Sequence, residues 1–368
     1  MVRDAALRRP LESAGNAGRR VPLMQFADRD SLVAMNRLAL RILVLAALLA
    51  LLAALRFGSV SIGTGALLEA SADLLQGRDS GSLASTLLAL RLPRAGTAMA
   101  VGGLLALSGA LLQSLLRNPL ADPYVLGVSG GASCAAMLAI AAGAGAIAIA
   151  LCAAGGALLA LSLLFVLAHR ALFARDVLLD PGKDSAILLT GVMIASLCAA
   201  ALSLVLSLAP DGRLRTMVFW LLGDLGGATS PALAALALAT WLVLCLLAQR
   251  DAPALNLMLG GDLQAYTQGV PTTRVRRRLI VVTAIATGMA VALAGAVGFV
   301  GFVAPHLVRR VVGANPRHVL PAASLLGAIL VLLADTVGRC VAAPLQLPVG
   351  ALMAIIGVPV FIWQLQRP

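Results

Sequence analysis

Charged and aromatic residues are scarce in this sequence. Charged residues make up 12% of the 368 positions and aromatic residues 4%, whereas an ordinary soluble domain carries about 25% charged residues. Lysine is almost absent, because 27 of the 28 basic residues are arginine and Lys183 is the exception. The scarcity of charge excludes an ordinary soluble domain, since such a surface needs many more ionised side chains.

Several chemical signatures are also missing. The P-loop pattern GxxxxGK[ST] is absent, because the one lysine is followed by Asp184 and no glycine stands at the first position, so the chain cannot hydrolyse ATP by that route. The five cysteines form no CxxC pair and the three histidines are scattered, so we expect neither a metal site nor a cofactor. No HExxH pattern indicates an intramembrane enzyme.

Long apolar runs dominate what is present. Hydrophobic residues make up 60% of the chain, and a helix needs about 20 apolar residues to cross a hydrocarbon core of about 30 Å. We therefore expect an all-α polytopic membrane protein with about ten transmembrane helices in residues 38–368, preceded by a polar, disordered cytoplasmic tail at 1–37. The expected spans are approximately 38–57, 95–116, 124–142, 145–168, 186–209, 232–249, 279–298, 300–312, 319–338 and 349–365.

The positions of the basic residues predict an orientation. With ten spans and both termini in the cytoplasm, about three quarters of the 28 basic residues lie on the inner side, as the positive-inside rule requires. The net charge of +12 therefore reports topology, and we expect no nucleic-acid partner.

Ionisable groups are rare within the expected spans, which is unfavourable for a carrier driven by an ion gradient. Asp335 and Arg339 are four residues apart and could pair on one helix face. Gln113, Ser108 and Ser196 are polar residues that could line a translocation path, or could instead form hydrogen bonds between helices.

Two blocks of sequence carry recognisable motifs. The first, 91–133, contains Arg91-Leu-Pro-Arg94, then Ser-Gly, Gln113, and Asn-Pro-Leu-Ala-x-Pro-x-x-Leu-Gly-Val-Ser. The second, 294–363, contains Pro-His, Ala-Asp, Arg339 and Leu-Pro-Val-Gly. Both blocks resemble the FecCD-type permeases, the membrane subunits of ABC importers for iron–siderophore complexes, haem and vitamin B12. The resemblance covers roughly residues 38–368.

The resemblance implies an assembly and a location. It implies the BtuC-like bundle of type II ABC importers in the bacterial inner membrane, surrounded by lipid. Two such subunits would form a homodimer that binds two cytoplasmic ATP-binding-cassette ATPase subunits and a periplasmic substrate-binding protein. The cargo would be a metal chelate, namely an iron–siderophore complex, haem or cobalamin. The alternative is a gradient-driven secondary transporter that works without an ATPase partner.

The resemblance also implies roles for individual residues. Arg91, Arg94 and Arg339 would dock the binding protein, although the first two could anchor a helix end and Arg339 could pair with Asp335. The cytoplasmic gate would comprise Asn118, Pro119, Leu120, Asp184 and Ser185, of which the first three could equally form an ordinary turn. ATPase coupling would use segment 255–269, with Leu259, Gly260, Gly261, Asp262, Leu263, Gln264 and Ala265. This segment has Gly-Gly-Asp where Gly-Glu is common in the family.

Overall fold

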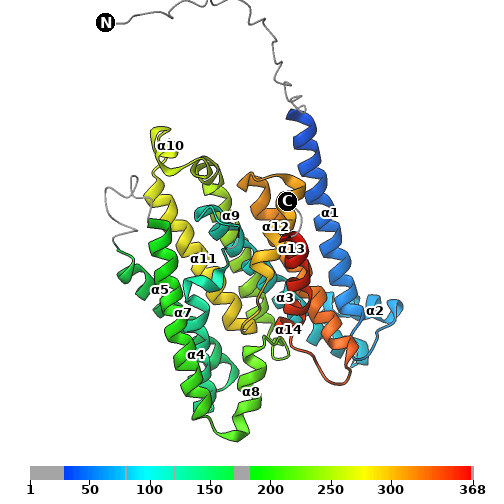
Figure 1. Ribbon diagram of the computed structural model, residues 1–368. Helices are drawn as coiled ribbons and strands as arrows, with labels where there is room; N and C mark the ends of the chain where they lie inside the picture. Colours follow the sequence, from blue (N-terminus) through cyan, green and yellow to red (C-terminus); the bar gives the residue numbers. More distant parts are fainter. Residues whose placement is uncertain (1–28, 79–80, 120, 170–182, 366–368) are drawn as a thin grey trace, which may run out of the picture.

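The structure is a computed structural model that describes residues 29–78, 81–119, 121–169 and 183–365 (Figure 1). Most of the predicted tail and the predicted gate residue Leu120 lie outside these ranges. Every regular element within them is a helix. The helices are α1 (Arg29–Arg56), α2 (Thr64–Leu75), α3 (Leu83–Leu115), the short 3₁₀ helix η1 (Pro123–Leu126), α4 (Val128–Ala142), α5 (Ala146–Leu167), α7 (Lys183–Ser207), α8 (Asp211–Leu221), α9 (Pro231–Leu259), α10 (Asp262–Thr267), α11 (Thr272–Ala294), α12 (Val300–Val312), α13 (Pro316–Val341) and α14 (Val349–Leu365).

Each of the ten expected spans corresponds to one of these helices. Among the described residues, seven helices are long and apolar enough to cross a membrane: α1, α3, α5, α7, α9, α11 and α13. The other three, α4, α12 and α14, have 15, 13 and 17 residues, and each is shorter than the roughly 20 residues of a full crossing. The multi-span all-α prediction is confirmed, and these three helices depend on neighbours to cover their ends.

Two helix boundaries differ from the expected ones. α3 begins at Leu83 and not near residue 95, because the Ser82 side chain accepts a hydrogen bond from Ser85 N at 3.1 Å and caps the helix. α9 continues to Leu259, so residues 250–259 do not form a separate surface helix. Buried residues at helical spacing explain the continuation, since one face of α9 keeps packing on the bundle past residue 249. These residues are Leu244, Ala248, Ala252 and Leu255.

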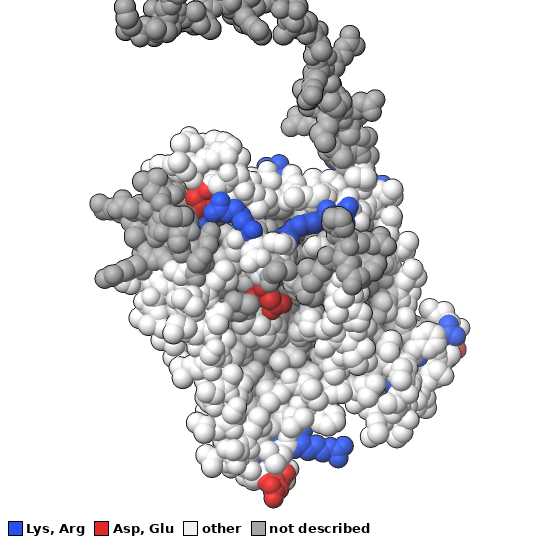
Figure 2. Space-filling model, in the orientation of Figure 1, with Lys and Arg blue, Asp and Glu red and all other residues white. Residues whose placement is uncertain are grey.

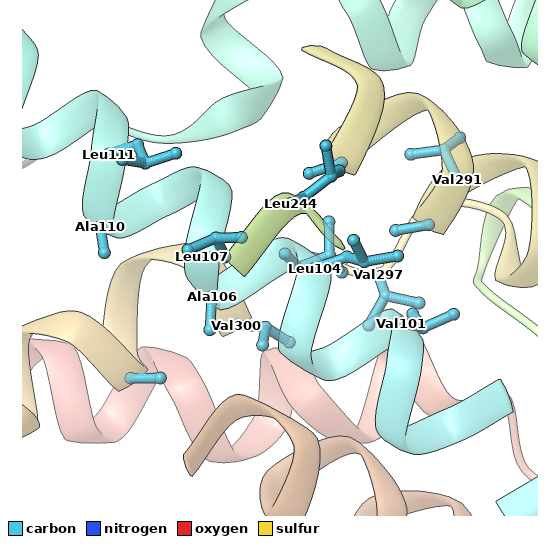
Figure 3. Packing of buried hydrophobic residues seen from close by; sticks show 14 of the residues in the cluster. Val101, Leu104, Ala106, Leu107, Ala110, Leu111, Leu244, Val291, Val297 and Val300 are labelled. Carbon is cyan, nitrogen blue, oxygen red and sulfur yellow. The ribbon is translucent and has the colours of Figure 1, made fainter. Parts of the chain in front are cut away.

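α3 lies at the centre of the bundle. Its most apolar window is 94% buried, and it packs on α9, α11, α12 and α13. Figure 3 shows its side chains meeting those of α9 and of the segment 291–300. Two glycines permit the closest contacts, because a Cβ added at Gly102 would lie 2.2 Å from Gly327 O and one at Gly109 would lie 1.8 Å from Gly301 O. Small side chains therefore bring α3 against α12 and α13.

The surface has charged ends and an apolar middle. Figure 2 shows basic side chains along the end of the bundle where α10 lies and a mostly uncharged surface between the two ends. Large apolar side chains are exposed along α1, α5, α7 and α9, including Leu45, Leu159, Leu197 and Leu242, each more than half exposed. This pattern is that of helices in contact with lipid or with other helices outside the chain.

Candidate functional site

An arginine cluster closes the end of the bundle away from α10. Arg94 on α3 donates from Nε and Nη2 to Asp335 on α13, with Nε–Oδ1 and Nη2–Oδ1 distances of 3.0 and 2.8 Å. Its Nη1 also donates to Gln346 Oε1 at 2.7 Å. The Asp335 side chain is only 2% exposed, so this pair is buried between the two helices.

Arg339 and Arg91 complete the cluster. Arg339 Nε lies 3.0 Å from Asp335 Oδ2 as an ion pair, and its Nη2 donates to Ala54 O at 3.2 Å. The expected Asp335–Arg339 pairing is therefore present. Arg91 donates to the carbonyl oxygens of Leu55, Arg56 and Val60.

The three arginines are buried inside the chain. Arg91, Arg94 and Arg339 are 6%, 8% and 7% exposed. The first two lie within α3, which begins at Leu83, and Arg339 lies in the last turn of α13. Three arginines and one aspartate leave a net charge of +2 in a shielded site, and Arg91 and Arg339 also donate to backbone carbonyls at the end of α1. This arrangement agrees with the alternatives, in which Arg91 and Arg94 anchor a helix end and Arg339 pairs with Asp335. The docking role of the three arginines stays a prediction.

The loop between α3 and α4 holds one half of the predicted gate. Arg117 has a positive φ of 48°, and Asn118 N donates to Gln113 O at 3.1 Å, so the chain turns sharply before Pro119. Burial raises the pKa of the Asp122 carboxyl to about 6, and a hydrogen bond from Tyr124 N opposes this shift.

The other predicted gate residues, Asp184 and Ser185, lie in the first turn of α7. α7 packs closely on η1 and α4, since a Cβ at Gly127 would lie 2.7 Å from Ile194 Cγ2. The loop after α3 is therefore tied to α7 through η1 and Gly127.

Two of the three predicted path residues face the chain's own interior. Ser108 has no exposed surface and donates to Leu105 O at 2.8 Å. Gln113, 3% exposed, donates to Gly301 O at 3.2 Å and accepts from Arg309 Nη1 at 2.5 Å. Gln113 therefore joins α3 to α12, as the alternative of hydrogen bonding between helices expects, whereas the bond of Ser108 lies within α3. The path role of both residues stays a prediction. Ser196 lies on the exposed face of α7.

The predicted coupling residues form a compact unit at the opposite end. Leu259 ends α9, Gly260 caps it, and Gly261 adopts φ 121°, a conformation that favours glycine. α10 then buries Asp262 and Ala265 and exposes Leu263, Gln264 and Tyr266. α9 therefore ends and α10 begins at the two adjacent glycines.

A buried ion pair fixes α10 to α11. Arg276 Nη2 lies 2.6 Å from Asp262 Oδ2, with the two side chains 3% and 5% exposed. A second pair joins α9 to α11, with Arg278 Nη2 2.7 Å from Asp251 Oδ1 and the Arg278 side chain 54% exposed. Neither pair was predicted from the sequence, although the acidic residue in Gly-Gly-Asp was an available signal for the first.

The coupling unit also approaches the gate loop. Arg117 Nη1 lies 3.9 Å from the position that a Cβ would take at Gly261. The turn that starts α10 and the turn that follows α3 are therefore neighbours, although residues 117 and 261 are far apart in the sequence.

Known proteins resemble this chain over nearly its whole length. The FecCD transport family matches residues 44–367. A hemin transport system permease protein of Yersinia pestis is 37% identical over 88% of this chain and 96% of its own length. An Fe(3+)-citrate import system permease protein of Bacillus subtilis is 35% identical over 90% and 96% of the two chains.

Two further relatives extend the comparison. A vitamin B12 import system permease protein of Klebsiella pneumoniae is 36% identical over 76% of this chain and 81% of its own. A solved structure, described as an inward-facing metal-chelate type ABC transporter, superposes with a TM-score of 0.76 at 27% identity and covers 90% of this chain and all of that chain.

Proposed function

The chain belongs to the FecCD transport family, and we propose that it is the permease subunit of an ATP-driven importer that moves a metal chelate from the periplasm to the cytoplasm of a bacterium. One observation supports this most directly. α10 presents Leu263 and Tyr266, 53% and 56% exposed, on a helix that a buried ion pair holds against α11. An exposed apolar pair on a fixed helix is suited to binding a partner protein.

The partner at α10 is a cytoplasmic ATPase subunit. The sequence has no P-loop, so the chain cannot hydrolyse ATP by that route. α10 lies at the end of the bundle that is rich in arginine (Figure 2), which is the cytoplasmic end under the positive-inside rule. Because Arg117 approaches Gly261, ATPase movements at α10 reach the loop that carries Asn118 and Pro119.

A second copy of the chain completes the path. α7 is a 25-residue helix whose apolar window is only 17% buried, and exposed residues such as Met193 and Leu197 lie along it together with Ser196. α7 also begins with the predicted gate residues Asp184 and Ser185. A homodimer that packs around the α7 helices would place both gate segments and Ser196 beside a shared axis.

The cargo belongs to the class carried by the relatives, whose names specify hemin, Fe(3+)-citrate and vitamin B12. We assign this chain an iron chelate, haem included, and place the choice among chelates in a periplasmic binding protein. The end away from α10 docks that protein. The buried cluster of Arg91, Arg94 and Arg339 carries a net charge of +2 with Asp335, which attracts an acidic partner over several ångströms even without direct contact.

The test is binding of the ATPase to surface variants of α10. Leu263→Glu with Tyr266→Glu removes the apolar contact without touching Asp262 or Ala265, so the ATPase should no longer co-purify with a permease that remains folded. Val60→Glu, at an exposed apolar position on the opposite end, is the matched control and should retain the ATPase. Full retention by the α10 variant would reject the assignment of α10.

A further inference from the structure

A groove with an apolar wall and a basic rim lies where α5, α9 and α11 meet, beside α10. Its volume is about 770 Å³. The wall is formed by residues from all three helices, among them Phe165, Leu247 and Ile285, and the rim carries Arg250, Arg274 and Arg277. The proposed transport function uses none of these side chains.

The charge on the rim selects an anion. The groove residues include four arginines, namely these three and Arg278, against the single aspartate Asp251, which leaves a net charge of +3. Arg278 is paired with Asp251 at 2.7 Å, and the side chains of Arg250 and Arg274 are exposed at the rim.

The apolar lengths of α9 and α11 place the rim of the groove at the boundary between the hydrocarbon core and the lipid headgroups. At a rise of 1.5 Å per residue, the apolar part of α11 from residue 279 to 294 extends about 24 Å, close to the hydrocarbon core of about 30 Å. In α9, residues 231–249 extend about 28 Å before Arg250. Both helices therefore place their rim arginines at the level of lipid headgroups, with the apolar wall below them in the hydrocarbon.

The apolar wall of the groove extends along α11 from the rim toward the middle of the bundle, the direction in which an acyl chain extends from its headgroup. Ile285 lies about 12 Å along α11 from Arg277, and Leu247, Val281 and Ile285 are 45%, 37% and 39% exposed. A free anion such as inorganic phosphate would leave this wall uncovered, whereas an acyl chain would cover it while its headgroup stays at the rim.

From this juxtaposition of charge, depth and apolar wall, we propose that the groove is a specific binding site for an anionic phospholipid. Basic pockets between transmembrane helices at this level bind acidic headgroups. The lipid bridges α5, α9 and α11 beside the coupling unit. Its placement in the inner leaflet rests on the proposed function, but the binding does not.

The experiment measures lipid binding to the purified full-length chain by native mass spectrometry, without ATPase or transport. The probe is phosphatidylglycerol, with zwitterionic phosphatidylethanolamine for comparison. The triple variant Arg250→Gln, Arg274→Gln, Arg277→Gln should bind phosphatidylglycerol about 100-fold more weakly, because each arginine near an anionic headgroup contributes about fivefold. Arg278 is retained because it pairs with Asp251.

The control carries the same change of charge elsewhere. Arg56→Gln, Arg78→Gln, Arg215→Gln alters three exposed arginines at the other end and should bind phosphatidylglycerol within about twofold of the unmodified chain. A second variant, Val281→Trp, fills the groove without changing charge and should weaken binding at least about tenfold.

Three results would overturn the proposal. The control triple variant could lose affinity as strongly as the rim variant, which would show that only overall charge matters. Phosphatidylethanolamine could bind as tightly as phosphatidylglycerol. Millimolar inorganic phosphate could displace the lipid, with Val281→Trp having no effect, which would show that the rim binds phosphate alone. Because no readout involves transport, failure here leaves the importer function standing, and failure of the importer function leaves this result standing.

Discussion

The ion pair of Asp262 and Arg276 is the contact that holds the coupling unit in place. The two side chains are 5% and 3% exposed and 2.6 Å apart. Asp262→Asn removes the negative charge and leaves Arg276 buried without its ionic partner. Loss of one member of a buried pair costs about 3–5 kcal/mol. This cost is large compared with the free energy that can hold a helix as short as α10 against the bundle. We therefore expect α10 to detach from α11 while the rest of the bundle remains folded.

The assay is hydrogen exchange of the α10 amides in the purified chain, together with ATPase co-purification. Asp262→Asn should raise exchange at residues 262–267 by about 100-fold to a few thousand-fold, since about 1.4 kcal/mol corresponds to a factor of ten, and should release the ATPase. The double variant Asp262→Leu, Arg276→Met replaces the pair by apolar side chains and should restore most of the protection.

Arg278→Gln is the matched control. It breaks the neighbouring pair with Asp251 on the same helix, but the Arg278 side chain is 54% exposed, so the loss should be about 1 kcal/mol or less. Equal exchange in Asp262→Asn and Arg278→Gln would refute the reasoning, because burial would then make no difference to the cost of removing a partner.

Three further predictions address other parts of the structure. Gly109→Ala should lower the melting temperature of the bundle by several degrees, because the added Cβ would lie 1.8 Å from Gly301 O. Gly155→Ala is the control and should be neutral or stabilising, because nothing lies within 4 Å of its added Cβ. Equal melting temperatures for the two variants would contradict the close packing of α3 on α12. Asp335→Asn should lower the melting temperature strongly, because Arg94 and Arg339 lose their shared carboxylate. Arg56→Gln, at an exposed position, is the control and should change the melting temperature little. A larger loss of melting temperature in Arg56→Gln than in Asp335→Asn would show that the cluster is not structural. The pKa of Asp122 is raised from 3.8 to about 6, so the folded chain binds this proton more tightly than the unfolded chain; the resulting stability is fully present below pH 3.8 and is lost as pH rises through about 6. Asp122→Asn should therefore flatten the dependence of the melting temperature on pH between about 4 and 7, and an unchanged pH profile would contradict the shift.

Much of the fold could be predicted because apolar runs report spans directly. The helix-neighbour pair of Asp335 and Arg339 followed from their spacing. Contacts between distant segments could not be predicted in this way. Arg94 and Asp335 are 241 positions apart, and only the packing of α3 on α13 brings them together.

The candidate site was harder to predict for a related reason. A polar residue in an apolar run can face a path or a neighbouring helix, and periodicity does not distinguish the two. Gln113 bonds to α12 and Ser108 bonds within α3, and Arg91 lies inside a helix that starts earlier than its apolar composition indicated. The proximity of Arg117 to Gly261 joins two loops whose sequences carry no common signal.

The most direct test of the account is uptake by reconstituted vesicles. The purified chain, its ATPase and its binding protein are combined in proteoliposomes, and accumulation of an iron chelate such as haem is followed with ATP supplied on the ATPase side. We expect uptake with the complete set and none when the ATPase is omitted, whatever proton or sodium gradient is imposed. Accumulation by the chain alone under a gradient would contradict the claim that this permease depends on ATP hydrolysis in another subunit.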